Sequence, residues 1–182
     1  FDININRIQD LKNGIDKTNE ISNKELLKAK GLILSSESKD IDGSDIFLIT
    51  VPTPITSDKN PDLKPLINAT ETVAKALNRR KNNCNPIIIY ESTVYPGTTE
   101  EICVPIIENI SGLVFNKDFF CGYSPERINP GDNNHKLTSI IKITSGSNEE
   151  ISSWIDNFYS LIIDAGTYKS PSIKVAEAAK II

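Results

Sequence analysis

Apolar positions along the chain follow two alternating patterns. Residues 45–51 and 86–90 form short, nearly continuous apolar runs, which are typical of strands buried within a sheet, and the first run is expected to be covered on both faces. Weaker runs predict further strands at residues 1–4, 32–34, 119–123 and 140–144. Between the runs, apolar residues recur every three or four positions, as they do on one face of a helix.

Two of the helical segments carry clear signals for where they begin. Ser22 and Glu25, three residues apart, form a capping box, and the helix that they start is expected to end at Gly31. Asp62 is placed as the N-cap of a helix over residues 63–77.

Three further helical faces are predicted, formed by Ile8, Leu11 and Ile15, by residues 99–108, and by Trp154, Phe158 and Leu161. Ser147 and Glu150 form a capping box ahead of the last of these faces, which is expected to pack in the core. Ser170 followed by Pro171 predicts the start of a final helix that continues to Ile182.

Strands that alternate with helices favour an α/β fold, with a doubly wound, mostly parallel sheet. In such a sheet, ligands bind beyond the carboxyl ends of the strands. Polar residues that directly follow the predicted strands are therefore the first candidates for function.

Composition narrows the classes of function. The 182 residues are 38% hydrophobic and 24% charged, as in ordinary globular proteins. A net charge of −4 disfavours a nucleic-acid-binding surface, and no apolar run has the length of a membrane helix. Cys84, Cys103 and Cys121 form no Cys-x-x-Cys pair, which favours a reducing, cytoplasmic setting. His135 has no second ligand in its sequence neighbourhood, so no metal site is predicted.

Two polar clusters follow the first strands. Asp2 is placed to accept hydrogen bonds from a ribose, although a single acid at this point is also typical of a turn, and no glycine-rich fingerprint precedes it. Thr53 stands between two prolines just after Val51, where it offers a hydroxyl to a ligand or belongs to a rigid turn.

Two richer clusters follow the later strands. Residues 91–99 join a strand to a helix N-terminus, a place that suits a phosphate or a reacting oxygen. Helix capping accounts for the hydroxyls at 98 and 99 but not for Ser92 and Thr93. Glu126 beside Arg127 suits acid–base chemistry and recognition of an anion, although a surface ion pair has the same pattern.

These clusters, taken in order, resemble the motifs of the UDP-glucose/GDP-mannose dehydrogenase family. The matching segments are Phe-Asp-Ile-Asn at 1–4 with Arg7, Val-Pro-Thr-Pro at 51–54, Ser-Thr-Val-Tyr-Pro-Gly-Thr-Thr at 92–99, Ser-Pro-Glu-Arg at 124–127 and Lys-Val-Ala-Glu-Ala-Ala-Lys at 174–180. Residues 90–97 and 124–132 are most similar to the bacterial UDP-N-acetylglucosamine and UDP-N-acetylgalactosamine 6-dehydrogenases of capsule, Vi-type and O-antigen synthesis.

The resemblance implies a Rossmann-like NAD-binding domain over residues 1–169, without its first strand, and the start of a long central dimerisation helix over 170–182. It implies an enzyme that oxidises the C6 alcohol of a UDP-N-acetylhexosamine to the uronic acid and reduces two NAD⁺. A homodimer without nucleic-acid or membrane partners is expected.

The resemblance also implies roles for single residues. The adenosine half of NAD is bound by Asp2 and Arg7, and the remaining cofactor contacts come from Val51, Thr53, Ser92 and Thr93, of which Thr93 is also grouped with the catalytic residues. Glu126 lies beside the reacting carbon, where it orients water or moves a proton. Arg127 and Ile128 border the UDP-sugar. Lys180 contacts the substrate, stabilises the developing oxyanion and shuttles protons.

The chain departs from the family in two ways. It lacks the Gly-x-Gly phosphate loop, and none of its three cysteines stands in the motif of the family's nucleophilic cysteine. Because it also begins at Phe1 and contains no methionine, we expect an interior piece of a longer protein that is inactive alone. Two alternatives stay open: a catalytically inactive nucleotide-binding or assembly module, and an alcohol dehydrogenase that stops at the aldehyde.

Overall fold

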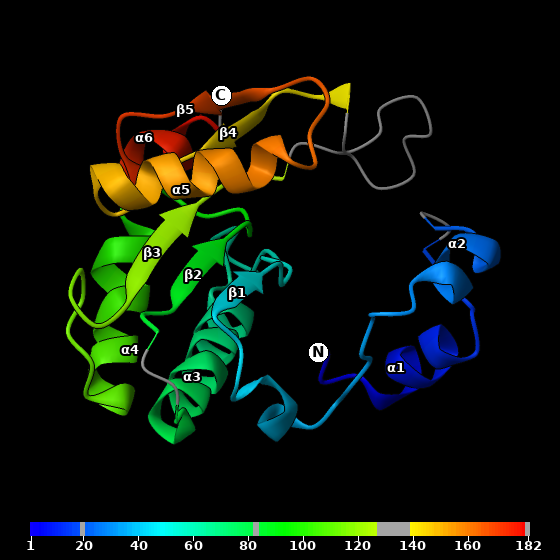
Figure 1. Ribbon diagram of the computed structural model, residues 1–182. Helices are drawn as coiled ribbons and strands as arrows, with labels where there is room; N and C mark the ends of the chain where they lie inside the picture. Colours follow the sequence, from blue (N-terminus) through cyan, green and yellow to red (C-terminus); the bar gives the residue numbers. More distant parts are fainter. Residues whose placement is uncertain (19–20, 82–83, 127–138, 181–182) are drawn as a thin grey trace.

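A parallel sheet forms the centre of the computed structural model, which describes residues 1–18, 21–81, 84–126 and 139–180. Three strands lie in the order β1-β2-β3 (Figure 1). They are β1 (Ile46–Ile49), β2 (Ile87–Tyr90) and β3 (Phe120–Tyr123). A separate parallel pair consists of β4 (Lys142–Thr144) and β5 (Thr167–Lys169), the second of which the sequence did not predict.

Helices cover both faces of the three-stranded sheet. On one face lie α3 (Lys64–Arg79) and α4 (Val104–Ser111), and on the other lies α5 (Glu149–Ser160) (Figure 1). The predicted α/β fold with a doubly wound parallel sheet is thereby confirmed. The helix predicted over 99–108 consists of one wide turn, η2 (Thr99–Cys103), continued by α4.

The remaining helices lie at the two ends of the chain. They are α1 (Ile5–Lys12), α2 (Asn23–Lys28), the short turn η1 (Ser38–Ile41) and α6 (Ile173–Ala178). In Figure 1, α1 and α2 stand apart from the sheet on the side of β1, whereas α6 packs near β4 and β5.

The central strand β2 contributes to two apolar clusters. Its residues Ile88 and Tyr90 pack with α3 and α4, and Ile87 and Ile89 pack with α5. All four side chains are buried, which confirms the prediction of a buried strand at 86–90.

The prediction that the strand at 45–51 is covered on both faces is wrong. Phe47 and Ile49 are buried in the cluster of α3 and α4, but Leu48, which points to the opposite face, is 47% exposed. The reason is the position of α5, which packs on β2 and β3; no helix of the described segments covers this face of β1.

Residues 1–4 and 32–34 are not strands, contrary to prediction. The two segments are joined near their ends by one backbone hydrogen bond, from Asp2 N to Ser35 O at 3.1 Å. A strand needs a ladder of such bonds, and no further strand of the described residues lies beside these segments to supply one.

Three predicted helix starts are displaced by one or two residues. The observed N-caps are Leu63 for α3, Asn148 for α5 and Ser172 for α6, instead of Asp62, Ser147 and Ser170. At α5 and α6 two capping side chains stand close together in the sequence, and the backbone that selects between them is not visible there. At α3 the Asp62 carboxylate still accepts from Lys64 N at 2.9 Å, although the helix begins one residue later than predicted. The capping box of Ser22 and Glu25 is confirmed, although α2 ends at Lys28 instead of Gly31.

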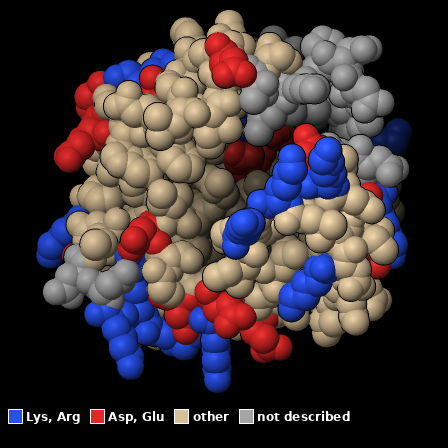
Figure 2. Space-filling view, turned by 45° about the vertical axis from the view of Figure 1, so that its right-hand side comes forward, with Lys and Arg blue, Asp and Glu red and all other residues tan. Residues whose placement is uncertain are grey.

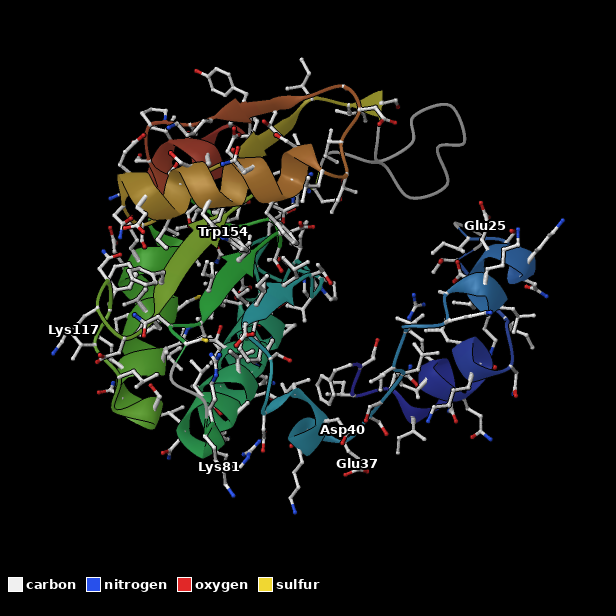
Figure 3. The ribbon with its side chains drawn as sticks, viewed as in Figure 1. Glu25, Glu37, Asp40, Lys81, Lys117 and Trp154 are labelled. Carbon is white, nitrogen blue, oxygen red and sulfur yellow. The ribbon has the colours of Figure 1, made fainter. Side chains whose placement is uncertain are left out.

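The buried face of α5 also differs from the prediction. Trp154 and Leu161 were expected to pack in the core, but Trp154 is 39% exposed and Leu161 is 86% exposed. Trp154, labelled in Figure 3, stacks instead on Phe158, with ring centroids 5.5 Å apart. The buried positions are Ile151, Ile155 and Tyr159. Both sets recur at helical spacing, so periodicity alone does not choose between them.

Candidate functional site

The carboxyl ends of β1, β2 and β3 meet at one edge of the sheet. Hydrogen bonds continue the strand register just past the strands, from Glu91 N to Ile49 O and from Ser124 N to Tyr90 O, each 2.9 Å. The loops that begin at 51, 91 and 124 therefore lie side by side. Three of the four polar clusters identified in the sequence belong to this edge.

Ser92 ties two of these loops together. Its hydroxyl donates to Val51 O at 2.7 Å, and its own carbonyl accepts from the Tyr123 hydroxyl at 3.0 Å. Burial raises the pKa of Tyr123, so this phenol remains a proton donor. Two residues predicted to contact the cofactor, Val51 and Ser92, are thus in direct contact, while Thr93 beside them is exposed.

Thr53 carries a buried hydroxyl that needs a partner. Its Oγ1 is inaccessible to water and has no hydrogen-bond partner within the described part of the chain. A buried polar atom in this state is destabilising by roughly 1–3 kcal/mol unless a ligand or another group satisfies it. The position of Thr53 next to the sheet edge makes a ligand a physically reasonable partner.

A groove of about 720 Å³ runs between the first residues of the chain and the free edge of β1. Asp2, Val51 and Pro52 contribute to its wall, together with residues of α3. Figure 2 shows a hollow on this side of the molecule, with acidic atoms at its upper end and basic side chains along one rim. The structure therefore brings Asp2 and Val51, from distant parts of the sequence, to one groove.

Asp2 is held by its own neighbours in the groove wall. Its Oδ1 accepts from Asn4 N at 2.8 Å, and its Oδ2 lies 3.7 Å from Arg7 Nε. The Asp2 carboxylate thus belongs to a local turn and lies near Arg7, which the resemblance places at the same half of the cofactor. A carboxylate in the wall of an extended groove is a feature that fits a dinucleotide such as NAD, and Thr53 directly follows Pro52 of the groove wall.

Glu126 and Lys180 are also in contact. Lys180, just after α6, donates from Nζ to the backbone carbonyl of Glu126. Ala176, one turn earlier on the same helix, is fully buried, and its small side chain lets α6 approach the core closely. Two residues predicted to be catalytic, 54 positions apart, thus lie together at the carboxyl edge of the sheet.

Two buried charged residues at this edge were not predicted. Glu177 is fully buried and accepts from Gly97 N at 2.5 Å and Thr99 N at 2.9 Å, so α6 holds the loop at 92–99. Lys142 is buried between Glu91 and Glu126. The signal for Glu177 was an acid among alanines in an apolar helix, whereas Lys142 had no sequence signal beyond its place in a short apolar run.

The remaining residues singled out in the sequence either fall outside the described structure or lie in the core. Arg127, Ile128 and His135 fall outside the described residues. Cys103 and Cys121 are buried in the core, and burial raises the pKa of Cys103 to about 11. A thiol in this state is a poor nucleophile at neutral pH.

Neither a metal-binding cluster nor a membrane-spanning helix occurs in the described segments. No group of three or more His, Cys, Asp and Glu side chains in them is arranged to hold a metal ion. None of their helices combines the length and the apolar character that crossing a lipid bilayer requires.

Residues 1–163 match the NAD binding domain of the UDP-glucose/GDP-mannose dehydrogenase family. The chain is 57% identical over all 182 residues to the UDP-N-acetyl-D-glucosamine 6-dehydrogenase of Salmonella typhi and 54% identical to that of Pseudomonas aeruginosa. Both alignments include 100% of this chain but only 42% of either relative. The chain thus spans less than half the length of these relatives.

Solved structures have the same fold. The UDP-D-ManNAc dehydrogenase of Pyrococcus horikoshii superposes with a TM-score of 0.86 at 30% identity, over 99% of this chain and 42% of that one. The GDP-mannose dehydrogenase of Pseudomonas aeruginosa superposes with a TM-score of 0.87 at 22% identity, with the same coverage. The second similarity concerns the fold alone.

Proposed function

Because the chain belongs to the UDP-glucose/GDP-mannose dehydrogenase family, we propose that the protein carrying it is an NAD-dependent nucleotide-sugar 6-dehydrogenase. The proposed substrate is a UDP-N-acetylhexosamine, whose C6 alcohol is oxidised to the carboxylate in polysaccharide biosynthesis. One observation carries the proposal: Glu126 and Lys180 meet at the sheet edge, in a chain that is 57% identical to a UDP-N-acetyl-D-glucosamine 6-dehydrogenase.

In this proposal the cofactor lies along the groove beside β1. When bound, NAD⁺ supplies the acceptor for the hydride that leaves C6. Asp2 accepts hydrogen bonds from the adenosine ribose, and Arg7 lies against the adenosine half. Thr53 directs its unpartnered hydroxyl to the cofactor, and Val51 and Ser92, held together by their hydrogen bond, form a fixed wall.

The chemistry falls to the residues beside the end of α6. As an ammonium, the Lys180 side chain stabilises negative charge on the C6 oxygen and returns a proton to it, and as a neutral amine it receives the proton of the C6 hydroxyl. Glu126 orients water or accepts a proton next to the reacting carbon, and Thr93, exposed on the adjacent loop, contacts the nicotinamide end. Arg127 and Ile128 are proposed to border the UDP-sugar.

The full reaction needs residues beyond those present here. Cys103 and Cys121 are buried, and the exposed Cys84 precedes β2, at the opposite end of this strand from the candidate site, so the 182-residue chain is proposed to be inactive alone. Residues 1–169 are proposed as the cofactor domain and 170–182 as the start of a central helix through which two subunits pair. A cytoplasmic location is part of the same proposal.

The test is the stoichiometry of NADH formation by the complete protein that carries this chain. UDP-N-acetylglucosamine and its C4 epimer are each supplied in limiting amount with excess NAD⁺, and GDP-mannose serves as the control sugar nucleotide. We expect about two NADH per sugar, because alcohol to acid is a four-electron oxidation. One NADH per sugar indicates an enzyme that stops at the aldehyde, and none with any sugar nucleotide indicates an inactive binding module.

A further inference from the structure

Lys142 is a buried cation at the floor of the candidate site. Its Nζ lies 3.4 Å from Glu91 Oε1, 3.5 Å from Glu126 Oε2 and 5.3 Å from the centre of the Tyr159 ring. Within the described residues, this Nζ makes no well-aligned hydrogen bond. Desolvation of an ammonium group is costly, and two carboxylates plus an aromatic face offset part of that cost.

The two carboxylates that face Lys142 differ in exposure. Glu91 is only 12% exposed, and its Oε1 also accepts a hydrogen bond from the Tyr159 hydroxyl. The Glu126 side chain is 39% exposed and borders the site. Lys142 therefore connects a fixed carboxylate below the site to a more accessible carboxylate within it.

A role in packing alone does not account for a lysine here. An apolar side chain of similar length would fill the same space without the cost of desolvation, and such replacements of buried charges are often neutral or stabilising. A cation at this point has one property that an apolar side chain lacks: it attracts the Glu126 carboxylate. Lys180 also contacts Glu126, because its Nζ donates a hydrogen bond to the Glu126 backbone carbonyl.

We propose that Lys142 is a positioning residue, which holds the Glu126 carboxylate in its orientation beside Lys180. This role rests on the proposed dehydrogenase function. Among the described residues, the charged or titratable groups that face the Glu126 residue or the Lys142 ammonium include Glu91 at the end of β2, Tyr159 on α5 and Lys180 after α6. Burial and the Glu91 carboxylate raise the pKa of Tyr159, so its phenol stays neutral.

The first test compares Lys142→Met with Lys142→Arg in the complete protein. The methionine keeps the length and removes the charge, and we expect kcat to fall roughly 10- to 100-fold, because a displaced catalytic group is costly. The KM for NAD⁺ should change less than about twofold, because the cofactor groove is separate from Lys142. Lys142→Arg retains a cation and should restore most of the activity.

A pH profile separates positioning from packing. Loss of the cation leaves two carboxylates facing each other, so the acidic limb of activity in Lys142→Met should move upward by roughly one pH unit. Glu91→Gln removes the competing carboxylate and should move the limb downward or leave it unchanged. Lys169→Met, on the adjacent strand β5 with a surface partner, is the matched control and should leave kcat and the pH profile unchanged.

A crystal structure of each variant gives a readout that does not need turnover. In Lys142→Met we expect the Glu126 carboxylate to leave its position near residue 142, and in Lys142→Arg to remain. Unchanged placement of Glu126 in Lys142→Met, or equal loss of kcat in the Met and Arg variants with an unchanged acidic limb, overturns the proposal. If Lys142→Met does not fold, Lys142→Arg decides: a kcat near that of wild type with Glu126 in place supports the proposal, and a large loss of kcat with Glu126 still in place overturns it. A wild-type protein inactive on all sugar nucleotides refutes the proposed function, and the crystal structures still decide whether Lys142 places Glu126.

Discussion

Single buried charges hold the loops of this site in place. Glu177 reaches from α6 to two backbone N–H groups of the loop at 92–99, and Lys142 reaches from β4 to Glu126. Neither role could be predicted from the sequence, because each depends on two elements whose packing is set far from the residue itself. By contrast, Glu126 and Lys180 were singled out by resemblance, since both stand within short motifs, and the structure brings them into contact.

Removal of the Glu177 carboxylate should loosen the loop that carries Thr93. Glu177→Ala leaves two buried N–H groups without their acceptor, with an expected loss of roughly 2–4 kcal/mol in stability. The Gly97 and Thr99 amides should therefore exchange with solvent much faster, as measured by hydrogen–deuterium exchange. Glu71→Ala, on the exposed face of α3, is the control. Protection at both amides equal to wild type contradicts this role.

The three cysteines should differ sharply in reactivity. Cys84 is exposed, whereas burial raises the pKa of Cys103 to about 11 and also raises the pKa of Cys121. At pH 8 in the folded protein, iodoacetamide should label only Cys84, because the other two remain protonated and enclosed. Peptide mass spectrometry identifies the labelled residues, and rapid labelling of Cys103 or Cys121 contradicts their placement in the core.

At the scale of elements, local sequence signals correctly predicted where some helices and strands form, but not which of their faces are buried. The capping box of α2 and the buried run of β2 depend on neighbouring residues, and both were predicted correctly. The core-facing side of α5 and the exposed face of β1 depend on which helix covers which strand, information that a single sequence pattern does not contain. The predictions of strands at 1–4 and 32–34 were wrong for a related reason: a strand forms only when a second strand pairs with it.

The contact between α5 and the end of β3 depends on two glycines. A Cβ at Gly146 would lie 2.4 Å from Ser152 N, and one at Gly122 would lie 2.2 Å from Ile155 Cδ1. Because the atoms near Gly146 are backbone atoms that cannot rotate away, Gly146→Ala should reduce stability by roughly 1–3 kcal/mol.

Thermal unfolding of the complete protein measures this effect. Gly43→Ala is the matched control, because no atom lies within 4 Å of the added methyl group and its midpoint should stay close to that of wild type. Equal midpoints for the two variants contradict the close approach of α5 to residue 146.

At the scale of the whole molecule, the site is assembled from distant parts of the chain. Thr53, Glu126 and Lys180 approach one sheet edge because three parallel strands end there and α6 returns to it, and Asp2 lies in the groove beside β1. The sequence predicted this edge through the alternation of strands and helices. It did not predict how β4 and β5 pair beside the main sheet, and therefore did not place the floor of the site.

The comparison of two lysines on one helical segment tests the proposed active site most directly. Lys180 contacts the Glu126 loop, whereas Lys174 is exposed and pairs with Glu101 on η2 at 2.8 Å. In the complete protein with NAD⁺ and UDP-N-acetylglucosamine, we expect Lys180→Ala to lower kcat by roughly 100-fold or more, because a charge that stabilises the transition state is lost. Lys174→Ala should retain kcat within about twofold, as expected for an exposed ion pair. Wild-type turnover by Lys180→Ala would contradict the assignment of the active site to this edge of the sheet.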